Sequence, residues 1–214
     1  MKNTIRRMTG LTFQVLPMLL LCVCVLIFTP GPAIAGKSGN VNTAGTWTID
    51  QLMQALAKAP PSRATFTEKK TFAMLDRPVE SSGELSYRPP SRLEKRTLKP
   101  KPETMVAEGD ALTLERPPRT FTLQLQAQPE LAGIIDSIRG TLAGDRTVLE
   151  RSFRLQLDGL EQRWVLTLFP LNAKLAANVH LIRIGGMRSD VQSVEVVQTD
   201  GDRSVMTITQ HEIK

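Results

Sequence analysis

Cysteine is almost absent from this chain of 214 residues. Its two cysteines, Cys22 and Cys24, both lie inside an apolar run from Val15 to Phe28. Neither follows a small residue at the end of that run, so the sequence predicts no lipoprotein attachment site. Once the run is removed, the chain has no thiol, which excludes a disulfide framework. The stability of the 179 residues from Gly36 to Lys214 must then come from one packed core.

A membrane-spanning helix is also missing from the sequence pattern. The apolar run has 14 residues, fewer than the roughly 20 that cross a bilayer. It follows three cations, and it precedes a Pro/Gly break and the small-x-small sequence Ala33-Ile34-Ala35. This order predicts a secretory signal peptide that is cleaved after Ala35. We therefore expect a periplasmic protein with a signal peptide at 1–35, a flexible N-terminal segment at 36–46 and a single domain at 47–214.

Neither sign of charge is in large excess. The formal net charge of the whole chain is +6. Without Lys2, Arg6 and Arg7 of the signal peptide, 24 Lys and Arg face 21 Asp and Glu, a net charge of +3. The charges are scattered, with no basic stripe interleaved with aromatic residues. Binding to nucleic acid is therefore not expected.

Residues that carry catalysis or bind metals are equally scarce. The histidines are His180 and His211, and no HExxH, glycine-rich phosphate loop or GxSxG motif is present. Glu68 and Glu84 form a conceivable carboxylate pair, but exposed strand carboxylates explain both more simply. We expect no catalytic residue, no metal site and no cofactor. An enzyme acting on an envelope lipid or glycan is the weakest hypothesis.

Helical periodicity is confined to two places. A first helix is predicted from Ile49 to about Ala59, with Thr48 and Gln51 forming a capping box and Pro60-Pro61 ending it. Trp47 is placed to pack onto Leu52 as a hydrophobic staple.

The second helical place is central. The spacing of the apolar residues predicts a helix from Pro129 to about Leu142 with one apolar stripe. Asp145 is a predicted N-cap of a further short helix through Leu149. When these two helices are considered alone, ordinary packing of their apolar sides against a sheet is a sufficient explanation.

Alternation with a period of two dominates the rest of the chain. Polar and apolar residues alternate in six short segments, separated by turns rich in Gly, Pro and Asp. The segments are Ala64–Phe66, Leu85–Tyr87, Leu112–Leu114, Phe121–Leu125, Phe153–Leu157 and Trp164–Leu168. Six or more such strands predict an antiparallel sheet, most simply a meander, which the helical pieces divide into two groups.

The order of the strand motifs resembles a known family. The motifs are Ala64-x-Phe66-x-Glu68-Lys69, Gly83-x-Leu85-x-Tyr87-x-Pro89-Pro90-x-x-Leu93, Pro102-Glu103 and Glu108-Gly109-Asp110-x-Leu112. This order is similar to that of the LolA family of periplasmic lipoprotein carriers, and most of all to a divergent LolA-related branch. The resemblance implies an α+β fold, mainly antiparallel β: an incomplete, curved β-barrel with helices covering its open face above an apolar cavity.

The resemblance also implies which residues form the binding site. The apolar strand residues expected to line a lipid-binding cavity are Phe66, Leu85, Tyr87, Leu93, Leu112, Leu114, Phe121, Leu123 and Trp164. The helical residues expected to form the lid are Ile134, Ile135 and Ile138. For each residue alone, ordinary core packing is the simpler explanation.

One position departs from the family pattern. In well-studied members an Arg before the proline that ends the second strand latches the lid, and here Pro89 occupies that place, with Arg88 displaced by one residue. A shift of one residue in a strand turns a side chain to the opposite face. Arg88 either reaches round the bend as a latch, or the latch is absent; the second alternative is slightly favoured.

The function implied is that of a monomeric carrier. It would bind the acyl chains of lipoproteins or of another envelope lipid, take them from an inner-membrane exporter and deliver them to an outer-membrane acceptor. The alternatives are a lipid-sensing or partner-binding module with the same fold, and a carrier specific for a glycolipid or pigment lipid.

Overall fold

The computed structural model describes residues 47–210. The predicted signal peptide at 1–35 and the predicted flexible segment at 36–46 lie outside the described residues. Within the described part of the chain, no helix has both the length and the apolar character required to cross a membrane.

The elements form eleven strands and four α-helices in the described range. The helices are α1 (Ile49–Ala57), α2 (Pro129–Leu142), α3 (Arg146–Ser152) and α4 (Ala173–Ala176), with a 3-10 turn η1 (Leu125–Ala127) before α2. The strands of the first group are β1 (Ser62–Thr71), β2 (Val79–Arg88), β3 (Arg92–Lys99), β4 (Glu103–Glu108), β5 (Ala111–Arg116) and β6 (Arg119–Gln124). Those of the second group are β7 (Phe153–Leu160), β8 (Arg163–Pro170), β9 (Val179–Met187), β10 (Asp190–Gln198) and β11 (Arg203–Gln210).

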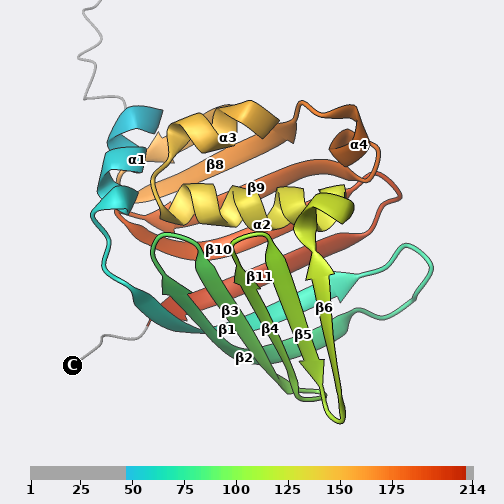
Figure 1. Cartoon of the computed structure of the whole chain (residues 1–214). Coiled ribbons are helices and arrows are strands. Elements are labelled where there is room, and N and C mark those ends of the chain that lie inside the picture. Colours follow the sequence, from blue (N-terminus) through green and yellow to red (C-terminus); the bar gives the residue numbers. More distant parts are fainter. Residues whose placement is uncertain (1–46, 211–214) are drawn as a thin grey trace, which may run out of the picture. The chain divides into compact units, whose positions relative to one another are not determined.

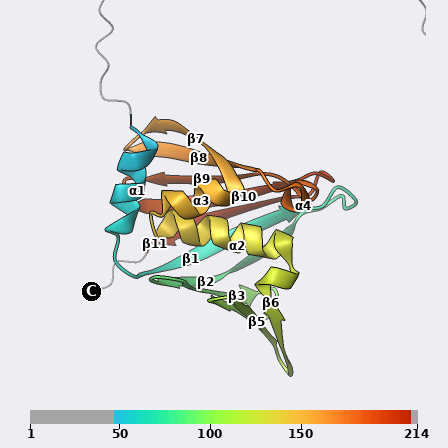
Figure 2. The ribbon, with the colours of Figure 1, turned by 45° about the horizontal axis from the view of Figure 1, so that its top comes forward.

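All eleven strands belong to one antiparallel sheet. Each group is a meander, and the two meanders are joined where β1 pairs with β11, from Ala64 opposite Gln210 to Thr71 opposite Arg203. The sheet order therefore runs from β6 to β1 and then from β11 to β7. The sheet curves strongly, β6 and β7 do not pair, and the helices lie on its concave face (Figures 1 and 2). The predicted fold class, an open antiparallel barrel with helices over it, is confirmed.

The predicted helices are present, with their predicted caps. Helix α1 begins at Ile49; the Gln51 N–H donates to Thr48 Oγ1 at 3.2 Å, and the Thr48 N–H donates to Gln51 Oε1 at 2.9 Å. Helix α3 is capped by Asp145, whose Oδ1 accepts the Val148 N–H at 3.0 Å. Helix α2 has the predicted bounds.

The predicted strand ending at Leu125 is one residue too long. Strand β6 stops at Gln124, because the Leu125 N–H donates to the Asp110 carbonyl at 2.9 Å and the Leu125 carbonyl accepts the Gln128 N–H at 2.8 Å. These two bonds turn the chain into η1 and direct it towards α2. The segment therefore leaves the sheet edge earlier than the alternation predicts.

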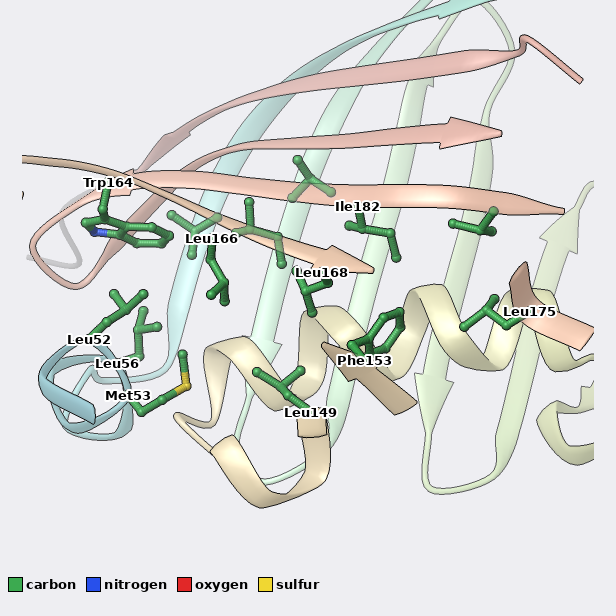
Figure 3. Close-up of a cluster of buried hydrophobic side chains, with 14 residues drawn as sticks. Leu52, Met53, Leu56, Leu149, Phe153, Trp164, Leu166, Leu168, Leu175 and Ile182 are labelled. Carbon is green, nitrogen blue, oxygen red and sulfur yellow. The ribbon is translucent and has the colours of Figure 1, made fainter. Parts of the chain in front are cut away.

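The main hydrophobic core fills the space between the second meander and the helices α1, α3 and α4 (Figure 3). Helix α1 contributes Leu52, Met53 and Leu56 from its apolar face. The sheet contributes the inner residues of β7 to β10: Phe153, Trp164, Leu166, Leu168, Val179, Ile182, Ile184, Val191 and Val194. Leu166 and Leu168 have no exposed surface. This half of the concave face is solidly packed around β8, whereas Ile184, Val191 and Val194 also border the space beneath α2.

We predict that Leu166→Ala destabilises the fold by about 2–5 kcal/mol, because a fully buried leucine leaves a cavity that its rigid neighbours fill incompletely. The measurement is the free energy of unfolding in urea. Leu160→Ala is the matched control, since Leu160 is 59% exposed, and a change below about 0.5 kcal/mol is expected there. Equal losses in the two variants would contradict the assignment of the core to this half of the sheet.

Candidate ligand-binding cavity

A cavity of about 430 Å³ lies between helix α2 and the middle of the sheet. Ligand pockets in proteins have volumes of about 300–1,000 Å³. The sheet wall of the cavity comes mainly from β1, β2, β3, β4, β10 and β11. Its apolar members are Ala64, Leu85, Leu93, Met105, Ala107, Ile184, Val191, Val194, Val196, Met206 and Ile208. The cavity therefore spans the seam where the two meanders meet.

Helix α2 forms the opposite wall with its apolar stripe. Ile134, Ile135 and Ile138 all line the cavity. The opposite side of the helix consists of small residues, and a Cβ at Gly133 would lie 2.6 Å from the Leu175 side chain of α4. A Cβ at Gly140 would lie 2.7 Å from the Leu149 side chain of α3. Close packing on this small-residue side fixes the rotation of α2, so that the stripe faces the cavity.

Three of the predicted strand residues lie in the cavity wall. Leu85 and Leu93 contribute apolar side chains from β2 and β3. Tyr87 also lines the cavity, and its hydroxyl donates to the Pro90 carbonyl at 3.1 Å. Burial raises the pKa of the Tyr87 phenol, against the opposing effect of the Arg139 charge.

Phe66, Leu112 and Trp164 lie in packed regions and do not line the cavity. Phe66 is 2% exposed and is covered by the ammonium of Lys95, 4.9 Å from its ring centre. Leu112 packs in a small second cluster with Leu125 and other residues. Trp164 lies in the main core, where its indole N–H donates to the Arg188 carbonyl at 3.0 Å. Alternation places all three on the inner face correctly, but neighbouring side chains fill the space around them.

Leu114, Phe121 and Leu123 also lie on the inner face, but outside the cavity. The register places Leu114 opposite both Met105 and Phe121, and Leu123 opposite Leu112. Phe121 is 46% exposed and Leu123 is 37% exposed. Strands β4 to β6 extend beyond α2 (Figure 1). These side chains therefore continue the apolar surface from the cavity wall towards the sheet edge, where no helix covers them.

The sequence pattern missed the contribution of the last strands. Val194 and Val196 on β10, and Met206 and Ile208 on β11, line the cavity. One polar residue separates the members of each pair, Glu195 in β10 and Thr207 in β11, so the period of two was a usable signal. The pairing of β1 with β11 is what brings these residues opposite α2.

A buried carboxylate, Glu68, lies on the inner face at one end of the cavity. It is 6% exposed. Its Oε2 accepts from Lys95 Nζ at 2.5 Å and from Ser81 Oγ at 3.3 Å. Its Oε1 accepts from Ser204 Oγ at 2.7 Å and lies 3.6 Å from Lys70 Nζ. The partners come from β1, β2, β3 and β11, so one side chain connects four adjacent strands.

Gly83 explains how Lys95 reaches across a strand. A Cβ on Gly83 would lie 1.9 Å from the Arg96 carbonyl oxygen, so only glycine fits at this irregularity between β2 and β3. In the register Gly83 lies between Phe66 and Thr97 on the inner face. Because Gly83 has no side chain, Lys95 extends over β2 to the Phe66 ring and the Glu68 carboxylate.

The charges around Glu68 decide its ionisation. Burial acts to raise the pKa of its carboxyl, but the Lys95 ammonium, the Ser204 hydroxyl and the Lys70 charge outweigh burial and hold this pKa below its ordinary value of 4.5. Glu68 is therefore an anion at neutral pH, and its ion pairs with Lys95 and Lys70 exist only in that form.

Helix α2 is tied to the first meander through its own arginine. Arg139 Nη1 donates to the Gly109 carbonyl in the β4–β5 turn at 2.8 Å and lies 3.6 Å from Asp136. Its Nε and Nη2 are buried and have no hydrogen-bond partner among residues 47–210. Arg88 is exposed at the end of β2, and no hydrogen bond or ion pair of its side chain is found in that range.

The conceivable catalytic residues are not brought together. Glu68 and Glu84 point to opposite faces of the sheet, since Glu68 pairs with Ser81 and Glu84 pairs with the exposed Thr65. Glu84 lies 3.8 Å from Arg96 on the outer surface. His180 is exposed on β9. Within the described residues, no group of three or more His, Cys, Asp or Glu side chains is arranged to hold a metal ion.

Comparison with known proteins gives one family match. A family profile described as "Outer membrane lipoprotein carrier protein LolA-like" matches residues 42–210. No curated protein matches the chain in a sequence comparison.

Several solved structures are similar at low identity. A LolA superfamily protein from Nitrosomonas europaea is 9% identical, with a TM-score of 0.41 over 78% of this chain and 95% of that one. LprF from Mycobacterium bovis is 10% identical, with a TM-score of 0.34 over 78% and 94%. A chain of the Pseudomonas aeruginosa MucA/MucB complex is 13% identical, with a TM-score of 0.37 over 76% of this chain and 54% of that one.

We predict that Glu68→Gln lowers the free energy of unfolding at pH 7 by about 1–3 kcal/mol, because it replaces hydrogen bonds to a charged acceptor by weaker ones. The pKa of Glu68 is lower in the folded state, so its contribution is fully present above pH 4.5 and is lost as the pH falls through the folded pKa. The difference between wild type and variant should shrink in acid. Glu84→Gln on the outer face is the control, and a pH-independent difference for Glu68→Gln would contradict the ion pair.

Proposed function

The chain belongs to the family of LolA-like outer membrane lipoprotein carrier proteins, and on that premise we propose that it carries acylated cargo, with the acyl chains in the cavity beneath α2. The observation that carries the proposal is an unfilled cavity of about 430 Å³ between two mainly apolar walls, one from the sheet and one from a helix. Its helical wall offers Ile134 and Ile138, which are only partly buried because they face this space.

The energetics of an acyl chain match such a site. Each methylene removed from water contributes about 0.8 kcal/mol, so a long chain cannot cross an aqueous compartment unshielded. The cavity covers part of a chain, and the half-buried Leu114 and the exposed Phe121 and Leu123 offer a continuing apolar surface towards β6. We infer that a chain longer than the cavity lies along this surface.

Helix α2 is the element that would move to admit cargo. It is the wall between the cavity and the helical layer, and η1 joins it to β6. The tie from Arg139 to the Gly109 carbonyl holds it over the first meander. We propose that Arg139 is the latch of this lid, in place of Arg88, which has an exposed position on β2.

The route of the cargo follows from the predicted signal peptide. Cleavage after Ala35 would deliver a single monomeric domain, 47–214, to the periplasm. There it would receive a lipoprotein, or another acylated lipid such as a glycolipid or pigment lipid, from an inner-membrane exporter. An outer-membrane acceptor would take the cargo. Protein isolated from its native periplasm and extracted with organic solvent should release bound lipid; consistently lipid-free protein that takes up no acyl probe would contradict the proposal.

We predict that Ile138→Asn weakens binding of a fluorescent acyl probe at least about tenfold, because a buried amide without a partner costs about 1–3 kcal/mol. The probe is titrated against the purified domain, and circular dichroism checks the fold. Leu160→Asn, at a position 59% exposed on the β7–β8 hairpin, should bind the probe like wild type. Unchanged binding by folded Ile138→Asn would place the acyl site elsewhere.

We also predict that Arg139→Met speeds release of the acyl probe about tenfold, because it removes the charge-assisted tie between α2 and the β4–β5 turn, a bond worth about 1.5 kcal/mol or more. Stopped-flow transfer of the probe to vesicles measures the rate. Arg88→Met is the matched control and should release the probe at the wild-type rate. If Arg88→Met accelerates release and Arg139→Met does not, the latch is Arg88.

A further inference from the structure

The polar residues of the cavity wall are not evenly distributed. Most of the wall is apolar, but Glu68, Lys70 and Lys95 gather on the inner face where Lys95 reaches from β3 over β2 to β1. Lys95 is 22% exposed although it lies on the concave face, because its ammonium borders the cavity. Charged groups contribute nothing to the binding of a hydrocarbon chain, so this charged end indicates a polar part of the ligand.

The carboxylate and the ammonium groups at this charged end differ in how much of their hydrogen-bonding capacity is in use. A carboxylate offers about four acceptor positions, and Lys95, Ser81 and Ser204 donate to Glu68 while Lys70 lies 3.6 Å away. Three of the acceptor positions of Glu68 are therefore occupied, and the Lys70 ammonium lies beside the carboxylate. The Lys95 ammonium has three N–H donors, and one of them donates to Glu68. The unused capacity is on the cations, which suits a ligand that brings acceptors.

Four further charged residues line the cavity, and each contacts the protein; Glu94 pairs with Arg92, and Arg203 pairs with Glu195. Glu130 lines the cavity from α2, and its Oε1 accepts from Gln198 Nε2 at 3.2 Å. Asp202 Oδ1 accepts the Ala73 N–H at 2.9 Å. On the floor of the cavity, two ammonium groups, Lys70 and Lys95, face one carboxylate, Glu68. The lining as a whole contains four carboxylates and three cations, so the excess of positive charge is confined to the cluster of Glu68, Lys70 and Lys95.

We propose that this end of the cavity is a headgroup subsite, where Lys95 and Lys70 bind the anionic oxygens of an acyl amphiphile, a phosphate or a carboxylate. Glu68 holds both ammonium groups in place, and the acyl chain extends from the subsite along Ile134 and Ile138. This inference rests on the proposed function and adds the class of cargo: anionic amphiphiles are bound in preference to neutral ones of the same chain length.

The test compares dodecyl phosphate with monolauroylglycerol, whose chains have the same length, in displacement of a fluorescent acyl probe from the purified domain. Wild type should bind dodecyl phosphate about tenfold more tightly than monolauroylglycerol. A tenfold ratio of affinities corresponds to about 1.4 kcal/mol, and a charge-assisted hydrogen bond contributes at least that much. Lys95→Met should remove this preference and keep the affinity for monolauroylglycerol within about twofold. Lys95→Arg should keep the preference.

Lys101→Met, at an exposed lysine of the β3–β4 turn, is the matched control and should behave like wild type. If Lys95→Met does not fold, Lys70→Met should still reduce the preference. The ratio of the two probe affinities can also be measured on wild type alone. Equal binding of the two probes by wild type would overturn the subsite and leave the proposed function intact. Failure of both probes to bind would refute the proposed function as well. Complete displacement of dodecyl phosphate by inorganic phosphate would show a free-anion site and overturn the inference.

Discussion

The pairing of β1 with β11 is the constraint on which the rest of the structure depends. It joins two locally formed meanders into one sheet, through eight residue pairs between segments at opposite ends of the domain. Without it, each meander would expose an apolar face with no opposing wall along the seam. Such a distant pairing closes a long loop and has a large entropic cost before any contact offsets it. Glu68 lies in this seam and bonds to Ser204 on β11, so a strong polar contact reinforces the point where closure is most costly.

Uneven coverage of the concave face produces both the core and the cavity. Helices α1, α3 and α4 seal the second meander, where Leu166 and Leu168 are fully buried. Helix α2 alone lies over the seam, and its close contacts at Gly133 and Gly140 hold it to the helical layer. The filled half supplies the stability of the domain through apolar burial. The other half can therefore leave apolar surface uncovered. A ligand that buries this surface is stabilised by the hydrophobic free energy of that burial.

The sequence predicted the features that local patterns determine. It did not predict the features that depend on the pairing of distant strands. The caps at Thr48 and Asp145, the bounds of α2 and its apolar stripe are local, and each agrees with the structure. Alternation assigned Phe66 and Trp164 to the inner face correctly, yet it could not show that other side chains fill the space around them. The same alternation could not place Met206 in the cavity, because that depends on β11 pairing with β1. The turn of Leu125 out of the sheet required a bond to Asp110, which no periodicity encodes.

The Glu68–Lys95 pair is costly if its only role is to hold the sheet together. Removing two charges from water carries a desolvation penalty that the attraction between them often only balances, and apolar replacements of the same volume can be equally stable or more so. A pair of leucines across β1 and β3 would continue the wall that Leu85 and Met105 already form. The charged pair instead leaves an ammonium with free donors at the edge of an apolar space, beside the Phe66 ring. Low local polarity strengthens any bond that a ligand oxygen makes there, so the proposed headgroup subsite would combine a tie between strands with donors that remain for a ligand.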